Sequence, residues 1–322
     1  MTDERSSGEA WPRVVVFGAG AVGCHFGAKL AMAGAPVTLV GRPTHVEAIR
    51  ARGGLVFDSG GERTTVALAA DASPAPVRDA DLVLLCVKSA DTAEAARTIA
   101  ALLHTGAAVL AMQNGVDNVE RARAAAPIDP VAAVVYVGAS MGGPGHVVHA
   151  GRGDLVIGEY PGAGRADPRR GARIAAVFER AGVTCRVSDD VRAELWTKLV
   201  MNAAFNAISA LSHARYGSIV ADPGTAATMR ALIDECVAVA RADGVAIGTP
   251  DALHASALTL GRAMATATSS TEQDLSRGRA TEIDALNGYV VRRGDALGVP
   301  VPVNRALHAL VRLLESGHAA RG

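Results

Sequence analysis

Short apolar runs alternate with segments of helical periodicity along the first part of the chain, a pattern typical of an α/β domain. Val14–Phe17 is such a run, Gly18 ends it, and residues 21–33 then have helical spacing. A second apolar run, Val37–Val40, follows and stops at Gly41. A strand, a helix and a strand within about 30 residues have the size of a right-handed βαβ unit. We therefore predict a parallel sheet that begins at residue 14.

The same alternation continues to about residue 188. Further apolar runs predict strands, and the segments between them predict helices; the strands are at 82–87, 107–112, 131–137 and 183–187, and the helices at 90–103 and 116–126. Between Tyr136 and Glu159 the chain is rich in glycine, with turn-forming residues at 142–145 and 151–153. This stretch predicts antiparallel hairpins that close the far edge of the sheet. A polar connector is expected at 161–168.

From Asp189 to Glu315 the spacing is helical almost throughout, with interruptions at glycine and proline. The fold class predicted is α/β, with an N-terminal Rossmann-type doubly wound sheet and a C-terminal all-helical domain. The expected division is a flexible tail at 1–12, a sheet domain at 13–188 and a helical domain at 189–322.

Composition narrows the class of protein. The chain is 49% apolar and 20% charged, which is typical of a folded protein, and its 32 basic and 32 acidic residues balance. Without an excess of positive charge, binding to nucleic acid or to a membrane surface is not expected. The N-terminus lacks the apolar core of a signal peptide, and no run has membrane-spanning length, so a cytoplasmic location is expected. The four cysteines are widely spaced, which predicts buried free thiols and no metal site.

A glycine motif lies between the first strand and the first helix. Gly18, Ala19, Gly20, Ala21, Val22 and Gly23 read G-x-G-x-x-G, in which the glycines allow a tight turn, close approach of a pyrophosphate and close helix packing. The second strand ends in Gly41 and Arg42, without the carboxylate that would bind the ribose hydroxyls of NAD. Arg42 therefore favours the 2′-phosphate of NADP(H), although a solvated loop arginine is the alternative.

Polar residues follow two later strands and line one predicted helix. Lys88 and Asn114 come at carboxyl ends of parallel strands, where ligands bind in open sheets, although such residues are often structural. Lys198, Asn202 and Asn206 are four residues apart and share one face of an otherwise apolar helix. A ligand-binding stripe and a structural polar seam, with Glu194 neutralising Lys198, both explain this pattern.

Taken together, these ordered motifs resemble the ketopantoate reductase family (2-dehydropantoate 2-reductase) over nearly the whole chain after Arg13. The resemblance also covers the serines at 269 and 270 and the stretch Thr281-Glu282-Ile283-Asp284. It implies that the chain reduces ketopantoate to pantoate in pantothenate and coenzyme A biosynthesis, with a hydride from NADPH. It further implies a small 2-oxo acid as substrate and is compatible with a homodimer through the helical domain.

The resemblance also assigns roles to individual residues. It implies that Lys198 is the proton donor and that substrate is bound by Lys198, Asn202, Asn206, Ser269 and Ser270. It implies that NADP is bound by the glycine motif from Gly18 to Gly23, by Arg42, Lys88, Asn114 and by Glu282. An ammonium group suits such chemistry, because it polarises a carbonyl and then transfers a proton as the hydride arrives.

One position departs from the family's pattern. Where pantoate-specific members carry a further substrate-binding asparagine, this chain has Tyr216 between Arg215 and Gly217. A paralogue that reduces another 2-oxo acid is therefore the near alternative. An NADP-binding regulator without turnover is a more distant one, since it would have little use for Lys198.

Overall fold

The computed structural model describes residues 10–162, 167 and 169–319 of the 322-residue chain. Contacts divide the chain into two compact units. Unit 1 comprises Met1–Val87, Asp91–Gln113 and Val119–Asp189, and unit 2 comprises Lys88–Ala90, Asn114–Asn118 and Asp190–Gly322. Two short segments that follow strands of unit 1 therefore belong to unit 2. The proposed division of function between 13–188 and 189–322 stays a prediction.

The described residues of unit 1 form a ten-stranded sheet with the order β4-β3-β9-β8-β7-β6-β1-β2-β5, and β10 pairs with β9. The strands are β1 (Val14–Phe17), β2 (Val37–Val40), β3 (Leu55–Ser59), β4 (Glu62–Val66), β5 (Ala69–Asp71), β6 (Leu82–Leu85), β7 (Ala108–Ala111), β8 (Val131–Gly143), β9 (His146–Gly158) and β10 (Cys185–Val187). The run from β5 through β2, β1, β6 and β7 to β8 is parallel. This arrangement confirms the predicted doubly wound sheet.

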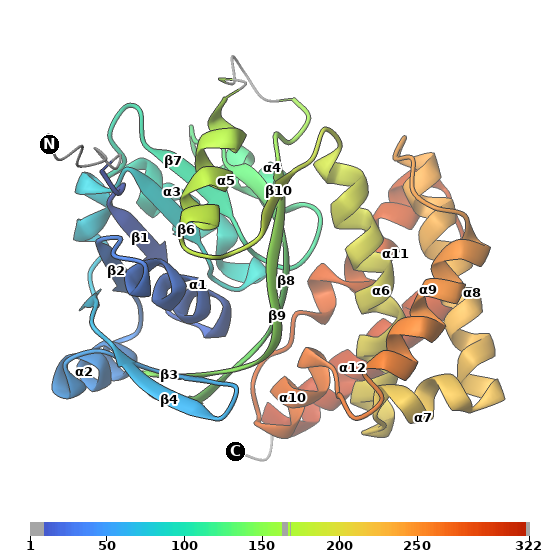
Figure 1. Cartoon of the computed structure of the whole chain (residues 1–322). Coiled ribbons are helices and arrows are strands. Elements are labelled where there is room, and N and C mark those ends of the chain that lie inside the picture. Colours follow the sequence, from blue (N-terminus) through green and yellow to red (C-terminus); the bar gives the residue numbers. More distant parts are fainter. Residues whose placement is uncertain (1–9, 163–166, 168, 320–322) are drawn as a thin grey trace, which may run out of the picture. The chain divides into compact units, whose positions relative to one another are not determined.

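Helices cover both faces of the parallel strands, which is why those strands are apolar along their whole length. On one face α1 (Ala21–Met32) and α5 (Arg170–Arg180) contribute to the larger core. On the other face η1 (Ala75–Asp79) and α3 (Thr92–Ala100) pack on the sheet, and α4 (Asn118–Ala125) packs on α3. Figure 1 shows α1 beside the central strands.

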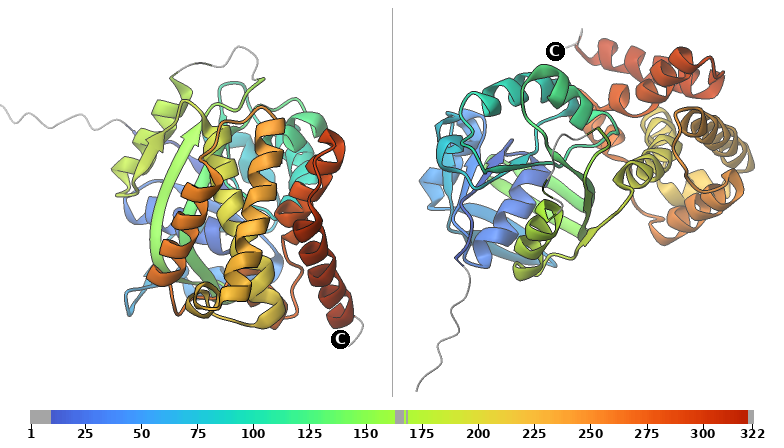
Figure 2. Two further views of the ribbon diagram at one scale, coloured as in Figure 1. Left: turned by 90° about the vertical axis from the view of Figure 1, so that its right-hand side faces the viewer. Right: turned by 90° about the horizontal axis from the view of Figure 1, so that it is seen from above.

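The glycine-rich stretch 136–159 forms one long hairpin, not several short ones. Strands β8 and β9 have 13 residues each, turn at Pro144 and Gly145, and curve around α1 (Figure 1 and Figure 2). The turn predicted at 151–153 is wrong, because these residues lie inside β9 as an irregularity in its pairing with β8, where Arg152 has a left-handed φ of 47°. A β-bulge absorbs the extra residues without reversing the chain.

The prediction that this hairpin closes the far edge is also wrong. Strand β3 adds to β9 in parallel, and β4 pairs antiparallel with β3. The sequence pattern did not indicate β3, β4, β5 or α2 (Pro43–Arg52), because β4 is an exposed edge strand of mostly polar residues and α2 has only two buried side chains, Val46 and Ile49. Edge strands carry little hydrophobic periodicity.

The predicted N-terminal tail and the predicted connector are only partly described by the structure. Residues 1–9 of the predicted tail and residues 163–166 and 168 of the predicted connector lie outside the described residues. Trp11 packs against the larger core, and the guanidinium of Arg180 lies 3.9 Å from the centre of its ring. Ordered packing therefore begins ahead of β1.

Unit 2 is helical where it is described, as predicted. Its helices are α6 (Val191–Ser212), α7 (Tyr216–Ala221), α8 (Pro223–Ala242), α9 (Pro250–Ala263), α10 (Ser270–Ser276), α11 (Asn287–Leu297) and α12 (Pro302–Ala319), with the short turn η3 (Ile283–Ala285). Helix α6 contacts α7, α8, α9, α10 and α12. Its second half is buried on all sides, which its small alanine and serine residues permit. Asp190 caps its N-terminus by accepting a hydrogen bond from the Ala193 backbone N–H at 3.0 Å.

No helix among the described residues is long and apolar enough to cross a membrane. The four cysteines are free thiols, as predicted; three are buried, and Cys86 is half-buried.

Candidate active site

The glycine motif forms a tight cradle in unit 1. Gly18 has a left-handed φ of 116°, and a Cβ atom there would lie 2.7 Å from the backbone of Cys86 and Val87. At Gly23 a Cβ atom would lie 2.3 Å from the carbonyl oxygen of Gly18. At Gly20, by contrast, a Cβ atom would meet nothing within 4 Å. Two glycines are therefore required by the fold, and Gly20 leaves open space above the loop.

The loop leads directly into the N-terminus of α1. Gly20 is the N-cap residue, no side chain caps the helix there, and the first turn has no acidic residue. The first N–H groups of a helix attract anions, and an acidic side chain would repel them. The cradle and this helix end therefore fit the pyrophosphate of a dinucleotide.

Two thiols, those of Cys24 and Cys86, lie beside the loop. Burial raises the pKa of Cys24 to about 12, and its thiol donates to the carbonyl oxygen of Ala19 at 3.4 Å. Burial, with a smaller contribution from Cys24, also raises the pKa of Cys86. Because a protonated thiol is a poor nucleophile, we expect these cysteines to pack beside the loop and not to react.

Arg42 follows β2 and lies exposed at the start of α2. Within the described residues its guanidinium has no hydrogen bond or ion pair. On the neighbouring strand β5, Asp71 pairs with Val40, the last residue of β2, and is thus an acidic residue beside the end of that strand. Its carboxylate accepts a hydrogen bond from the Ser73 N–H at 2.8 Å and lies 3.8 Å from the Arg50 guanidinium. The end of β2 thus presents a cation, while its neighbouring carboxylate is already bound.

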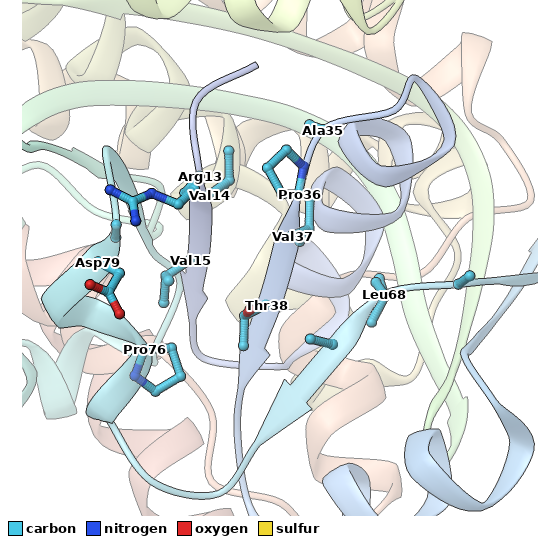
Figure 3. Close-up of a pocket in the computed structure, with 13 residues that line it drawn as sticks. Arg13, Val14, Val15, Ala35, Pro36, Val37, Thr38, Leu68, Pro76 and Asp79 are labelled. Atoms are coloured by element: carbon cyan, nitrogen blue, oxygen red, sulfur yellow. The ribbon is translucent and has the colours of Figure 1, made fainter. Parts of the chain in front are cut away.

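A cavity of about 440 Å³ opens elsewhere in unit 1 (Figure 3). Its lining comes from the segments 13–15, 35–38, 67–69, 76 and 79–80, which lie around the starts of β1 and β2. The glycine loop lies at the opposite, carboxyl ends of these strands, where ligands bind in open sheets. We therefore assign no part of the proposed site to this cavity.

The polar residues predicted from the strand ends and from α6 meet in unit 2. The ammonium of Lys198 donates to the Asn114 side-chain oxygen at 2.9 Å, and the Asn114 Nδ2 donates to Oε2 of Glu282 at 3.0 Å. The other carboxylate oxygen, Oε1, accepts from the backbone N–H of Ser89 at 3.2 Å and from its hydroxyl at 3.1 Å. The structure thus joins Lys198, Asn114 and Glu282 in one continuous network.

Lys88 lies next to this network but has other partners. Its ammonium donates to Oδ2 of Asp274 at 2.5 Å and to the carbonyl oxygen of Ala280 at 2.9 Å. It therefore ties the segment after β6 to the segment between α10 and η3. Its predicted role in binding NADP stays a prediction.

The rest of the α6 stripe lies along the same helix. Asn202 is half-buried and has no hydrogen bond from its side chain within the described part of the chain. Asn206 is 3% exposed and donates to the hydroxyl of Ser270, which is exposed, at 3.4 Å. Ser269 is fully buried; its hydroxyl caps α10 by accepting from the Glu272 N–H at 3.0 Å and donates to the Asn206 carbonyl at 3.3 Å. The hydroxyl of Ser269 is thus occupied within the protein, whereas that of Ser270 is accessible.

Tyr216 lies at the start of α7 with its ring stacked on Phe205, at a centroid distance of 4.2 Å. Its backbone N–H donates to the carbonyl of Ala267, close in sequence to Ser269 and Ser270. Burial raises the pKa of Tyr216 to about 12, so its hydroxyl is protonated at neutral pH. It can therefore donate a hydrogen bond but carries no charge.

One residue of this network, Ser89, is not predicted from the sequence, because a serine after a strand has no distinctive spacing. A signal was nevertheless present in the composition. Only three of the 32 basic residues are lysines, Lys29, Lys88 and Lys198, and two of these three lie in this part of unit 2. A guanidinium does not release its proton in proteins, whereas an ammonium can.

Comparison with known proteins covers both units. The family model for ketopantoate reductase PanE/ApbA matches residues 14–162, and the model for its C-terminal part matches 190–315. A 2-dehydropantoate 2-reductase of Halobacterium salinarum is 36% identical over 305 residues, covering 94% of this chain and 99% of that protein. A crystal structure of a PanE/ApbA family ketopantoate reductase from Ralstonia eutropha is 47% identical with a TM-score of 0.87, covering 95% of this chain and 99% of the other.

A further structure shows how widely this fold is used. D-mandelate dehydrogenase, solved with NADH and anilino(oxo)acetate, has a TM-score of 0.88 at 22% identity, over 95% of this chain and 99% of that one. At this identity the likeness shows the fold alone. The family models and the sequence relatives go further and confirm the resemblance found from the motifs. The chain belongs to the ketopantoate reductase family, which consists of oxidoreductases that act on the C=O/CH–OH pair.

Proposed function

We propose that this protein reduces ketopantoate to pantoate, a step of pantothenate and coenzyme A biosynthesis, with NADPH as reductant and Lys198 as proton donor. The observation that carries the proposal is the network of unit 2, in which the Lys198 ammonium is held by the neutral amide oxygen of Asn114. The amide oxygen accepts from the ammonium and so orients it. A positive charge at this position would stabilise a developing alkoxide.

The proposed roles follow from the chemistry of each group. When bound, NADPH supplies a hydride to the carbonyl carbon of the oxo acid. Lys198 donates a hydrogen bond to the carbonyl oxygen, polarises it and transfers a proton to it as the oxygen gains charge. Asn202 and Asn206 offer amide donors to the carboxylate and hydroxyl of the substrate, and Ser270 adds a hydroxyl. A lysine can act as proton donor in this position, whereas an arginine would hold its proton.

The preference for NADPH over NADH rests on Arg42. The glycine loop and the start of α1 would hold the pyrophosphate, and the exposed guanidinium of Arg42 would bind a 2′-phosphate. No carboxylate replaces it at the end of β2, since Asp71 is engaged by Ser73 and Arg50. Arg42 would strengthen the binding of NADPH but would not repel NADH, whose ribose is uncharged at this position. The expected preference for NADPH is therefore a difference in affinity.

A paralogous activity on another 2-oxo acid is supported by Tyr216. Its ring, stacked on Phe205, is larger and more apolar than the asparagine of pantoate-specific relatives and brings one hydroxyl donor. Such a side chain favours an apolar or aromatic group on the oxo acid. A noncatalytic NADP-binding regulator is the remaining alternative, and a homodimer and a cytoplasmic location stay predictions.

The test is NADPH oxidation measured by absorbance with ketopantoate, 2-oxoisovalerate, pyruvate and phenylglyoxylate, with a reaction lacking oxo acid as control and NADH in parallel. Turnover of ketopantoate with a kcat/KM at least tenfold above the other acids is expected. A higher kcat/KM for another acid would replace ketopantoate and direct attention to Tyr216. Tight binding of NADPH without turnover of any acid would contradict the proposal and favour the regulator.

A further inference from the structure

Ser89 lies in the short segment after β6 that belongs to unit 2, and its side chain is 2% exposed. We propose that Ser89 is a positioning residue for the reduction proposed above, on which this inference rests. It fixes the carboxylate of Glu282 and the backbone of Asn114, so that the amide oxygen of Asn114 faces Lys198. Ser89 itself touches neither Lys198 nor, in this proposal, the reacting atoms.

Three contacts join Ser89 to its two partners. Its hydroxyl donates to the carbonyl oxygen of Asn114 at 2.7 Å and lies 3.1 Å from Oε1 of Glu282, a geometry in which two acceptors share one proton. Its backbone N–H donates to the same Oε1 at 3.2 Å. The Asn118 Nδ2 also donates to the Asn114 carbonyl, at 2.7 Å. The backbone of Asn114 is thus held at a carbonyl that accepts two side-chain donors.

The orientation of the Asn114 amide decides what Lys198 meets. An asparagine side chain has a donor end and an acceptor end, and rotation by half a turn exchanges them. An ionised carboxylate only accepts hydrogen bonds, so Glu282 binds the NH₂ end of Asn114 and leaves the oxygen for Lys198. If Glu282 moved, the amide could turn its NH₂ group toward the ammonium, and that contact would be repulsive. By fixing Glu282, Ser89 fixes the acceptor that orients the proton donor.

The segment that carries Ser89 is itself anchored. Lys88, the preceding residue, binds Asp274 and the carbonyl of Ala280, and Ser89 binds Glu282 two residues beyond Ala280. Two adjacent residues therefore hold one stretch of chain at two points. Removal of the Ser89 hydroxyl alone should loosen Glu282 and leave the anchor at Lys88 in place.

The first experiment measures kcat and KM of Ser89→Ala and Ser89→Cys, alone and combined with Glu282→Gln. Thr225→Val is the matched control, because it removes a hydroxyl that binds a backbone carbonyl, that of Ile219, elsewhere in unit 2. We expect Ser89→Ala to lower kcat about tenfold, with KM and melting temperature changed little, because a misplacement of about 1 Å can cost about 10²-fold and a smaller shift costs less. Ser89→Cys keeps a weak donor and should lose less activity. In the Glu282→Gln background, Ser89→Ala should lower kcat less than twofold further, since Asn118 still holds the Asn114 carbonyl and the remaining effect of Ser89 runs through the carboxylate that is already lost.

A second experiment reads the position of Lys198 without turnover. The chain has only three lysines, so acetylation of each can be followed by peptide mass spectrometry. A less constrained Lys198 should be acetylated several times faster in Ser89→Ala than in the parent or in Thr225→Val, with Lys29 as the internal reference. If the parent reduced no oxo acid, the proposed function would fail, yet this measurement would still decide the role of Ser89. An unchanged Lys198 rate in both Ser89 variants, or a full tenfold loss of kcat in the Glu282→Gln background, would overturn the inference.

Discussion

The glycine loop of unit 1 and the network around Asn114 in unit 2 are built by opposite means. The loop consists of backbone and empty space, and two of its glycines are needed because any Cβ atom would strike the protein itself. The network consists of side chains from four separate stretches of sequence, each holding the next by a hydrogen bond. The loop is therefore sensitive to added atoms and the network to lost ones.

The largest effect is expected at Lys198, where loss of one ammonium tests the network. Lys198→Ala should lower kcat by about 10³-fold, the typical contribution of a general acid, and leave the Kd for NADPH within twofold of the parent. Lys198→Arg is the control: it keeps the charge but not a transferable proton, so its kcat should stay low. Kinetics with NADPH and the preferred oxo acid would check this. Near-parental turnover of Lys198→Arg would mean that charge alone suffices.

The loop is tested by adding one methyl group at two of its glycines. Gly23→Ala places a Cβ atom against the Gly18 carbonyl and should destabilise the protein by about 3 kcal/mol, as overpacking does. Gly20→Ala meets open space, so it should melt close to the parent but bind NADPH about tenfold more weakly. Thermal melting and titration with NADPH separate the two outcomes. Equal melting temperatures would contradict the packing of the loop.

A fall in pH should destabilise unit 1 through His25. This side chain is fully buried in α1, and neither ring nitrogen has a hydrogen-bond partner among the described residues. Burial, with smaller contributions from His149 and Lys29, lowers the pKa of His25 from 6.5 to about 3. As the pH falls, the unfolded chain therefore binds a proton at His25 before the folded chain does. The contribution of neutral His25 to the free energy of unfolding is present above pH 6.5 and is lost as the pH falls toward 3.

At pH 5 the loss amounts to about 2 kcal/mol relative to pH 7.5, since each unit of pKa difference corresponds to roughly 1.4 kcal/mol. Urea unfolding of the parent and of His25→Leu at both pH values measures it. The variant should lose about 2 kcal/mol less than the parent on acidification. The same loss in both proteins would assign the acid sensitivity to other groups.

The smallest effect is expected at Arg42, whose side chain follows β2, whereas the glycine loop offers only backbone groups. Arg42→Ala should weaken NADPH binding about tenfold and leave NADH binding unchanged, because only NADPH carries the 2′-phosphate. Titrations with both nucleotides test this, and Arg52→Ala, also exposed and at the end of α2, is a suitable control. Equal weakening of both nucleotides would indicate a general effect on the loop.

The parts of the fold that could be predicted are those in which burial imposes a periodic pattern. The central strands, α1 and the helices of unit 2 were identified because their apolar residues repeat with the spacing of the element. Strands β3 and β4 were missed, and the residues 151–153 were misread as a turn. Strand β4 is an exposed edge strand without an apolar repeat, β3 has only three apolar residues, and a glycine-rich bulge has the same composition as a turn.

By itself, the sequence determined the local features: the strand, glycine turn and helix of the loop, the cation after β2, and the stripe that carries Lys198 on α6. Each depends on residues close together in the chain, where spacing and backbone geometry suffice. Only the tertiary structure decided which groups meet. It joined Lys198 to Asn114, Asn114 to Glu282 and Glu282 to Ser89, residues up to 193 positions apart. Hydrogen bonds of this kind depend on ångström-scale placement of distant segments, for which sequence spacing contains no measure.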